Sequence, residues 1–436
     1  MVYECHGSLF HQFESVINVY LHVRTMEPIH GTLKASKFAP EDVISNMPND
    51  VVTHILERLP LQDAVRTGIL SRNWRFKWTM LSQLIFDDNF FEYLLETEGE
   101  NNYGTIISSL IPHLKGVITK FVLYIEQRTY RILDDEDINH WILLLSRNGI
   151  KDLTFCKENG PRLKLPKHLF SCLELQHLKL VSCCFDPPGS FNGFPNLLSL
   201  ELRSVQFESG KFGEFFTQCP VLETLNFGFT FPAGNVKLTE ISKLANLKML
   251  SLLLFSLENT MITRSSSIFE LVGSFPKLEE LHLDFIKFKF TEGDAEKRFH
   301  TTFPCFKTLK LSRIDLCNGI MLSCAFEMIR SFPKLETLEV TASYWDDSPT
   351  PGNCSLEVDY NTMGLLQLRS VVFTYLKGSE NEVFLIKNLL ACSPILKKLV
   401  IHPHSCLASD EKLMFAMKLL KLHRASPVAE IDLCWF

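Results

Sequence analysis

One phrase recurs along most of this chain and limits what the chain can fold into. It runs from an aromatic residue or cysteine through proline, any residue, leucine, two variable residues, leucine, one variable residue and a final apolar residue. Copies begin at Phe194, Cys219, Phe275, Phe303 and Phe332, serine leads a further copy at Ser393, and weaker relatives lie near 175, 247 and 368. Their lead apolar residues are 22 to 33 residues apart. A chain of this kind grows by stacking similar units, each of which lacks a sufficient core of its own.

Each phrase has the pattern of a short strand. Its last two apolar residues alternate with polar residues, which gives a strand with one buried face. Proline two places before the lead leucine cannot continue a helix, so it ends the preceding helix and starts the extended run. Helix-like segments, such as those around 266 and over 322–332, lie between the phrases.

The spacing of the phrases is close to the 20–29 residues that are typical of leucine-rich repeats. We therefore expect an α/β fold in which a leucine-rich-repeat solenoid, right-handed, has a parallel sheet on its concave side. A doubly wound α/β domain is the alternative. It requires a glycine-rich phosphate-binding turn after its first strand, which the sequence lacks.

A different module precedes the repeats, over residues 42–88. Val51, Ile55 and Leu59 recur four apart, with Val52 and Leu56 beside them, which predicts a helix with a broad apolar face. Pro60 ends that helix, a second follows over 61–69, and a third is predicted after a Ser71 N-cap, with Trp74 and Trp78 one turn apart. Three short helices bury little surface, so their excess apolar faces predict docking onto another protein.

This module resembles a plant F-box. The pattern D-x-I-S-x-L-P-D-x-x-L-x-x-I-L-x-x-L-P, then A-V-x-T-x-x-L-S-x-x-W and W, is matched at Asp42, Ile44, Ser45, Pro48, Asp50, Ile55, Leu56, Leu59, Pro60, Ala64, Val65, Thr67, Leu70, Ser71, Trp74 and Trp78. Departures from it are Met47, Asn49, Val52, Asn73 and Phe76-Lys77. The resemblance implies binding to the Skp-type adaptor of a cullin ubiquitin ligase. An ordinary helical cap on the solenoid is the alternative.

The C-terminal part is similar to the FBD region that closes many plant F-box/leucine-rich-repeat proteins. The matching features are Leu366, Leu368, Val371, Phe373, Gly378, Glu382, Leu389-Leu390-Ala391, Leu396, Ile401 and the turn Arg424-Ala425-Ser426-Pro427. We expect two more strand–helix units here and a last strand around Ile431 and Leu433. The expected organisation is a poorly ordered extension (1–40), an F-box (41–90), a leucine-rich-repeat solenoid (91–360) and an FBD region with the solenoid end (361–436). The order of modules resembles that of the plant F-box/FBD/leucine-rich-repeat family.

Composition excludes several other classes of protein. The net charge is −6, the pI is about 6.2 and the basic residues are scattered, so nothing indicates nucleic-acid binding. No uncharged apolar run reaches the ~20 residues that a membrane span needs. Thirteen cysteines, an odd number without a C-x-x-C pair, predict reduced thiols and a cytoplasmic or nuclear protein.

No catalytic chemistry is indicated by the sequence. It lacks a G-x-S-x-G elbow, an H-E-x-x-H helix and a P-loop. His402, His404 and Cys406 form the densest metal-like cluster, but they are more simply part of a loop after a strand. An acidic run from Asp134 is expected to begin a helix rather than to bind calcium. We therefore predict no enzyme activity, no cofactor and no metal.

The resulting hypothesis is a substrate receptor with two binding surfaces. The predicted adaptor-binding residues are Met47, Pro48, Val51, Ile55, Leu59, Pro60 and Trp74, although some of them must instead hold the helices together. The candidate target-binding residues are Lys179, Glu201, Asn226, His282, Lys310 and Glu339. They lie in the middle of successive predicted strands, in a row that also contains Ser251, Val372 and Val400. For any one of them, a merely solvated strand position is the alternative. Two alternatives remain open, a repeat scaffold and a small-molecule sensor, both acting outside a ligase.

Overall fold

The computed structural model describes residues 47–70, 73–98, 103–125, 135–158, 160–207, 212–228, 230–231, 241–256, 265–288, 303, 305–344 and 365–435. The chain divides into two compact units, which end and begin at Phe194 and Pro195. The expected extension over 1–40, the F-box positions Asp42, Ile44 and Ser45, and the N-cap Ser71 lie outside the described residues.

The first unit begins with short helices and continues with parallel strands. Its elements are α2 (Asn49–Leu56), α3 (Leu61–Arg66), η1 (Thr67–Ile69), η2 (Lys77–Met80), β1 (Gln83–Phe86), α4 (Asp88–Glu98), α5 (Tyr103–Leu110), η3 (Ile111–His113), β2 (Lys120–Ile125), α6 (Asp135–Arg147), β3 (Asp152–Lys157), β4 (Leu163–Lys164), η4 (Lys167–Ser171), β5 (His177–Val181) and β6 (Cys183–Cys184). Strands β1, β2, β3 and β5 pair in chain order, all in parallel.

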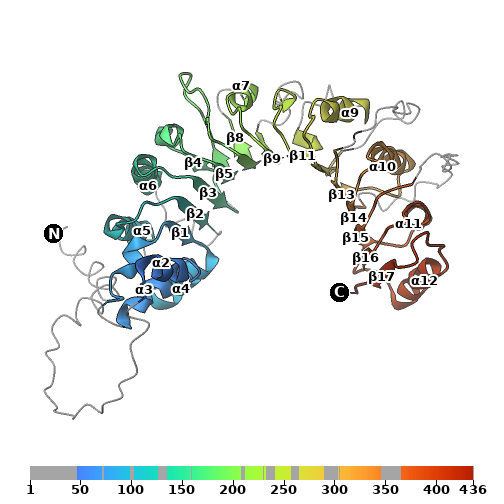
Figure 1. Cartoon of the computed structure of the whole chain (residues 1–436), viewed down its shortest axis with the longest axis horizontal. Coiled ribbons are helices and arrows are strands. Elements are labelled where there is room, and N and C mark those ends of the chain that lie inside the picture. Colours follow the sequence, from blue (N-terminus) through green and yellow to red (C-terminus); the bar gives the residue numbers. More distant parts are fainter. Residues whose placement is uncertain are drawn as a thin grey trace, which may run out of the picture. The chain divides into compact units, whose positions relative to one another are not determined.

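The second unit repeats a strand and a connecting segment. Its elements are β7 (Ser199–Arg203), β8 (Val205–Gln206), α7 (Phe212–Thr217), β9 (Thr224–Phe227), β10 (Thr230–Phe231), β11 (Met249–Leu253), η5 (Leu254–Ser256), α9 (Ser265–Gly273), β12 (Glu280–Asp284), β13 (Thr308–Ile314), α10 (Gly319–Ser331), β14 (Thr337–Ala342), β15 (Ser370–Leu376), α11 (Glu380–Cys392), β16 (Lys398–Pro403), α12 (Ser409–Leu420) and β17 (Glu430–Leu433). Helices α9 and α10 lie where the sequence predicts helices, and helices α9 to α12 lie on one side of the strands (Figure 1).

Strands β7, β9 and β11 to β17 of the second unit form a parallel sheet in chain order, in continuous register except for shifts near the ends of β13 and β15. The second leucine of each phrase faces its counterpart in the next strand, so that Leu200, Leu225, Leu250, Leu281, Leu309, Leu338, Val371 and Leu399 form one column. Every member of the column is at most 1% exposed. Burying a leucine stabilises the fold by about 2 kcal/mol, so this column is a large part of the core. The predicted parallel sheet is confirmed.

Three strands of the first unit carry no copy of the phrase. They have only alternating apolar residues, which are Leu84 and Phe86 in β1, Phe121, Leu123 and Ile125 in β2, and Leu153 and Phe155 in β3. All seven side chains are at most 1% exposed. The repeated array of strands thus begins well before the first recognisable phrase.

The N-terminal module contains α2 and α3 but not the predicted third α-helix. Residues 77–80 form a 3₁₀ helix instead, and Phe76 before it has φ −120° and ψ 11°. This conformation lies outside the helical range and interrupts a continuous helix between Trp74 and Trp78. Both tryptophans are buried, at 4% and 7% exposed, and help to form the core of the module.

The C-terminal part has the element order β15, α11, β16, α12 and β17. A capping box begins α11: the Ser379 hydroxyl accepts from the Glu382 N–H, and the Glu382 carboxylate accepts from the Ser379 N–H at 2.9 Å. The same carboxylate, which is fully buried, also accepts a hydrogen bond from the Tyr344 hydroxyl. This bond ties α11 to the residues after β14.

Other sequence expectations can be compared with the described residues. Helix α6 begins at Asp135, within the acidic run, as predicted; Asp134 lies outside the described residues. In the part of the chain that the structure covers, no helix has the length and apolar character needed to cross a membrane.

Gly378 gives a test of the packing between β15 and α12. Its φ is +77°, and an added Cβ would lie 2.8 Å from Cγ of the buried Phe415 ring on α12. Gly378→Ala should therefore lower the free energy of unfolding by roughly 2–4 kcal/mol and increase deuterium uptake by residues 409–420. Gly149→Ala is the matched control, because φ is +69° there but no atom lies within 4 Å of the added Cβ. It should cost about 1–2 kcal/mol and leave exchange in α12 unchanged; equal uptake in both variants would contradict the packing.

Candidate functional site

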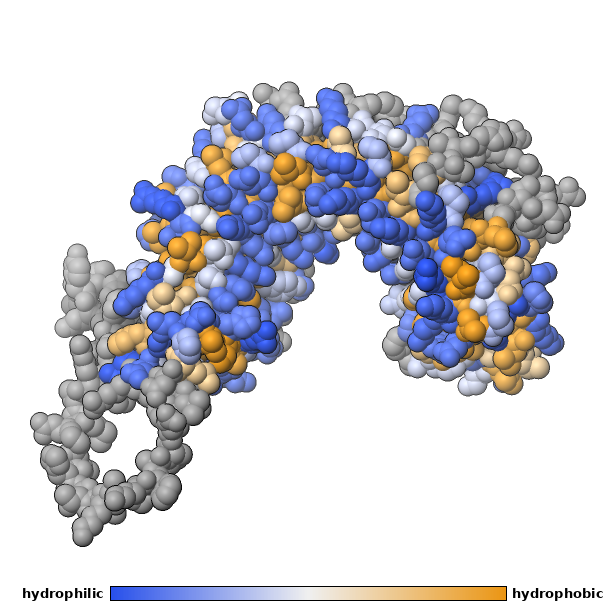
Figure 2. Space-filling view, in the orientation of Figure 1, coloured by the Kyte–Doolittle hydropathy of each residue, from blue (hydrophilic) through white to orange (hydrophobic). Residues whose placement is uncertain are grey.

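Helix α2 has two apolar faces. Val52 and Leu56 face the core of the module and are at most 1% exposed. Val51, Ile55 and Leu59, four residues apart along and just beyond the helix, are 43%, 38% and 39% exposed. The sequence predicts these three for adaptor binding, and in the structure all three are exposed, Val51 and Ile55 one turn apart on α2 and Leu59 in the turn after it. Figure 2 shows apolar side chains at the surface of these helices.

The other predicted adaptor-binding residues are distributed differently. Pro48 and Pro60 are exposed, at the two ends of α2, and Met47 is half-buried. Trp74 is 4% exposed, so in this structure it lies in the core of the module rather than on its surface. The reason is that its indole and that of Trp78 fill the space between short helices that have few other large side chains.

Four exposed apolar residues of the same module were missed by the sequence analysis as binding residues. They are Ile69, Leu70, Phe76 and Met80, which are 66%, 64%, 58% and 45% exposed. The signal for them was present, since the module has more apolar residues than its small core can bury.

Two departures from the F-box pattern contact each other. The Lys77 ammonium group donates a hydrogen bond to the side-chain oxygen of Asn49, which links η2 to the first turn of α2. Asn49 in α2 and Lys77 in η2 are therefore compatible with the packing of the module.

A cleft of about 250 Å³ lies next to the end of α2. Leu56, Glu57, Arg58, Leu59, Pro60, Leu61, Leu81, Gln83, Ile85 and Asp87 line it. Two of the predicted adaptor-binding residues, Leu59 and Pro60, thus border a depression that reaches the first strand of the repeats.

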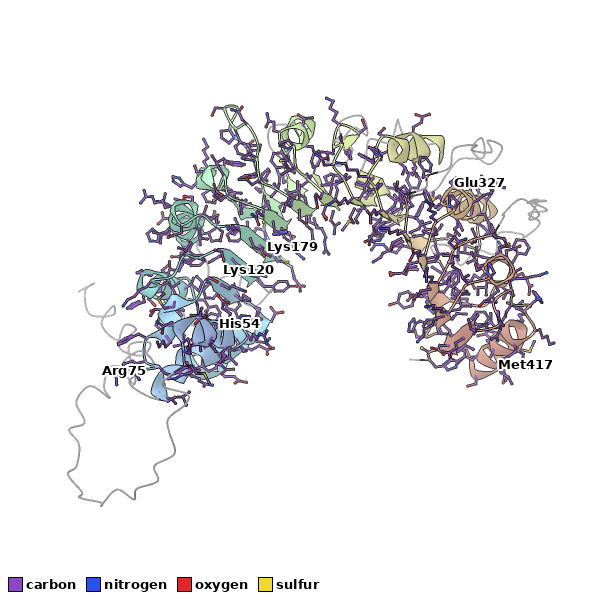
Figure 3. All side chains as sticks on the ribbon, in the orientation of Figure 1. His54, Arg75, Lys120, Lys179, Glu327 and Met417 are labelled. Atoms are coloured by element: carbon purple, nitrogen blue, oxygen red, sulfur yellow. The ribbon has the colours of Figure 1, made fainter. Side chains whose placement is uncertain are left out.

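The row of predicted target-binding residues lies in register in the sheet. In the second unit Glu201, Asn226, Ser251, His282, Lys310, Glu339, Val372 and Val400 are consecutive register partners. In the first unit Lys179 is the partner of Thr154, which in turn faces Val122. Figure 3 shows Lys120 and Lys179 on the side of these strands away from α5 and α6. Within each unit, the residues of the row therefore occupy matching positions on adjacent strands.

Several members of the row form ion pairs, Lys310 with neighbouring strands and Glu201 within its own strand β7. Lys310 Nζ lies 3.4 Å from Glu280 and 3.6 Å from Glu339, and the Arg203 guanidinium donates to Glu201. A second series of ion pairs follows the strand entrances, with Lys248–Glu223, Lys307–Glu279 and Arg369–Glu336 separated by 2.7, 2.6 and 3.4 Å. Each such exposed pair contributes about 0–1 kcal/mol to the free energy of unfolding. Each pair also neutralises opposite charges, which leaves less net charge to attract a polyanion or a polycation.

His282 joins three strands through both ring nitrogens. Its Nδ1 lies 3.0 Å from the Ser251 hydroxyl on β11, and its Nε2 lies 2.7 Å from the Ser312 hydroxyl on β13. Burial lowers the pKa of His282 below its usual 6.5, against a smaller raising effect of Asp284. The neutral ring is therefore part of the structure that holds the row together.

The described residues provide little for catalysis or metal binding. Among them no group of three or more histidine, cysteine, aspartate and glutamate side chains could hold a metal ion. His404 packs against the rings of Tyr344 and Tyr375, at 5.9 and 6.1 Å between centroids. Burial raises the pKa of the Cys172 thiol to about 12, which makes this thiol a poor nucleophile near neutral pH.

Comparison with known proteins assigns the module and the repeats. A model of the F-box domain matches residues 44–86, and a model described as "FBD-associated F-box protein At5g56370, LRR repeats" matches residues 138–266. The Arabidopsis thaliana "F-box/FBD/LRR-repeat protein At1g13570" is 30% identical over 413 residues, which is 89% of this chain and 98% of that protein. The chain belongs to the F-box/FBD/LRR-repeat family. The Arabidopsis thaliana "FBD-associated F-box protein At4g10400" is 29% identical over 258 residues, 56% of this chain and 61% of that protein.

Membership in the F-box/FBD/LRR-repeat family fits the geometry of both surfaces. The match to the F-box domain model includes α2, with its exposed row Val51, Ile55 and Leu59, and the match to the repeat model includes β3 to β11. The early strands β1 and β2 lie before the repeat match, in keeping with their lack of the phrase.

His282 predicts a pH dependence of stability. Above the usual histidine pKa both the folded and the unfolded protein are neutral at this site. As the pH falls below about 6.5, the unfolded chain binds a proton that the folded protein resists, so stability is lost progressively down to the lowered pKa of the folded state. Wild-type stability, measured by denaturant unfolding, should therefore fall between pH 7.5 and about 5.5.

His282→Ala should remove most of the fall in stability that the titration of His282 causes at low pH. At pH 7.5 the substitution should lower the free energy of unfolding by about 1–3 kcal/mol, because the buried Ser251 hydroxyl loses a partner. His177→Ala, at an exposed histidine on β5, is the matched control and should keep the wild-type pH profile. An unchanged profile in His282→Ala would show that the histidine does not titrate in this way.

Proposed function

We propose that this chain is the substrate-recognition subunit of an SCF-type ubiquitin ligase, which combines a Skp-type adaptor, a cullin and an F-box protein. The observation that carries the proposal is the set of exposed apolar residues Val51 and Ile55 on α2 and Leu59 just after it, within the segment that matches the F-box domain model. Large apolar side chains that are partly exposed in the free chain contribute binding free energy when a partner covers them.

The adaptor would cover more than this row. Ile69 and Leu70 at the end of α3 and η1, together with Phe76 and Met80 around η2, add further apolar surface in the same module. Such a surface supports a stable interface, because a cluster of large apolar side chains at the centre is the usual source of binding energy. Trp74 would support this surface from inside the module.

The repeats would hold the target protein. Their polar row has both signs of charge, and its members are tied to one another by ion pairs and by the bonds of His282, which fixes their positions. A pre-ordered row loses little side-chain entropy when a partner binds. At the end of the row Val372 and Val400 offer apolar contact. This combination suits a protein with a mixed surface.

In this role the chain needs no catalytic side chain. It would bring a target close to a ubiquitin-conjugating enzyme that the cullin recruits, so its contribution to the reaction is proximity and orientation. The described cysteines form no disulfide among themselves, which supports a reducing compartment, and we propose the nucleus or the cytoplasm.

Leu59→Asp tests the adaptor interface. An aspartate there would place a carboxylate in an apolar interface without a partner, so adaptor affinity should fall at least about a hundredfold. The measurement is size-exclusion chromatography of the full chain co-expressed with a Skp-type adaptor. Because Leu59 is 39% exposed, the variant should keep the far-ultraviolet circular dichroism of the wild-type protein.

Leu173→Asp is the matched control, since Leu173 is an apolar residue that is 50% exposed and lies outside the F-box match. It should bind the adaptor as the wild-type chain does. Undiminished binding by a folded Leu59→Asp variant would rule out this face. Failure of the wild-type chain to bind any Skp-type adaptor would instead favour a repeat scaffold that acts outside a ligase.

A further inference from the structure

Helix α12, the last helix of the chain, is apolar on two opposite faces. Phe415 and Leu419 are 2% exposed and pack against the core of the second unit. Leu413, Met414, Met417 and Leu420 are 62%, 58%, 45% and 74% exposed. At 100° per residue Met417 and Leu413 point nearly opposite to the buried pair, and Met414 and Leu420 lie on the two sides of that direction, about 60° from it. Figure 3 shows Met417 on the outer side of this helix, and Figure 2 shows apolar side chains on the surface there.

The exposed face has the spacing of a helix-pairing seam. Leu413, Met417 and Leu420 follow one another at four and three residues, which is the alternation of the two core positions of a coiled coil. A surface helix normally has charged residues opposite its buried stripe, and a helix that is apolar all round is normally covered on all sides. The outer face of α12 therefore has the character of a surface that a second helix covers.

The ends of the same face have opposite charge. Asp410 lies one turn before Leu413 and Lys421 lies directly after Leu420, and both are exposed and on the outer face by the same geometry. In an antiparallel pair of two such helices Asp410 of each lies opposite Lys421 of the other. In a parallel pair equal charges would meet. The outer face of α12, with Asp410 at one end and Lys421 at the other, therefore complements a second copy of itself that is related by a two-fold axis.

The last strand of the sheet also has partly exposed apolar side chains. Ile431 and Leu433 on β17 are half-exposed, whereas their register partners Leu399 and Ile401 on β16 are at most 1% exposed. Val428 before β17 and Trp435 after it are 66% and 42% exposed. Among the described strands β17 pairs with β16 alone and ends the sheet order. At the C-terminal end of the second unit, apolar residues at positions that are buried in the preceding strand are thus partly exposed to solvent.

We propose that two copies of this chain associate through α12, with the two helices antiparallel across a two-fold axis. The axis passes between Met414 and Met417, so that the apolar seams face each other and the two Asp410–Lys421 pairs close the ends. The occupant is a second copy because one surface then supplies both the apolar seam and its complementary charges, as a two-fold interface requires. This surface is separate in sequence from the F-box face, so the proposal does not depend on adaptor binding.

Sedimentation velocity of the full-length chain tests the proposal. The wild-type chain should shift from monomer to dimer as its concentration rises, and Leu420→Glu should raise the dissociation constant roughly tenfold or more, because it places two carboxylates in the seam. Leu420 is 74% exposed, so the thermal unfolding midpoint should not change. Ile69→Glu, at an F-box residue that is 66% exposed, is the matched control and should dimerise as the wild-type chain does.

Charge reversal identifies the partner as a second copy. Asp410→Lys alone and Lys421→Asp alone should each weaken the dimer, by roughly fivefold, because equal charges then meet at both ends of the seam. The double variant should restore it, since reversed pairs form again between copies. A wild-type chain that stays monomeric overturns the proposal, and so does a dimer that Leu420→Glu leaves intact or that Ile69→Glu abolishes.

Discussion

Each repeat of this protein buries its apolar side chains only because a neighbouring repeat lies against it. Leu309 on β13, for example, faces Leu281 on one side and Leu338 on the other, and all three are at most 1% exposed. A single strand and helix would leave these residues in water, so no repeat is stable alone. The same dependence determines where apolar faces stay uncovered. The F-box helices and α12 both have apolar faces that no described neighbour covers, and both lie near the ends of the repeated array.

Stacking also decides what the open face of the sheet offers to a partner. Side chains one strand apart are close enough to pair, and Lys310 and His282 use this closeness to join β11, β12, β13 and β14. The polar row is therefore ordered and largely neutralised before any target arrives. Recognition then depends on the shape and arrangement of the row rather than on a strong field, in keeping with a net charge of −6 on 436 residues.

The sequence predicts the sheet register because each phrase carries its own alignment: proline marks where a strand begins, and alternation marks which residues are buried. It assigns residues 91–360 to the solenoid but does not locate β1 to β3 individually, because these strands keep alternating apolar residues, such as Phe121 and Leu123, without a copy of the phrase. It also cannot tell which apolar residues of a small module are inside. Trp74 and Leu59 both fit the F-box pattern, yet one is 4% and the other 39% exposed, because burial depends on packing between helices. The outer face of α12 is visible only when its inner face is known.

Hydrogen–deuterium exchange of the full-length chain, with and without a Skp-type adaptor, tests the central claim most directly. Our account predicts slower exchange in residues 47–80 when the adaptor is bound, with exchange unchanged in the strands that carry the polar row. That result would assign adaptor binding to the F-box and leave the repeats open for a target. Protection over β11 to β14 with none in residues 47–80, or no complex at all, would contradict it.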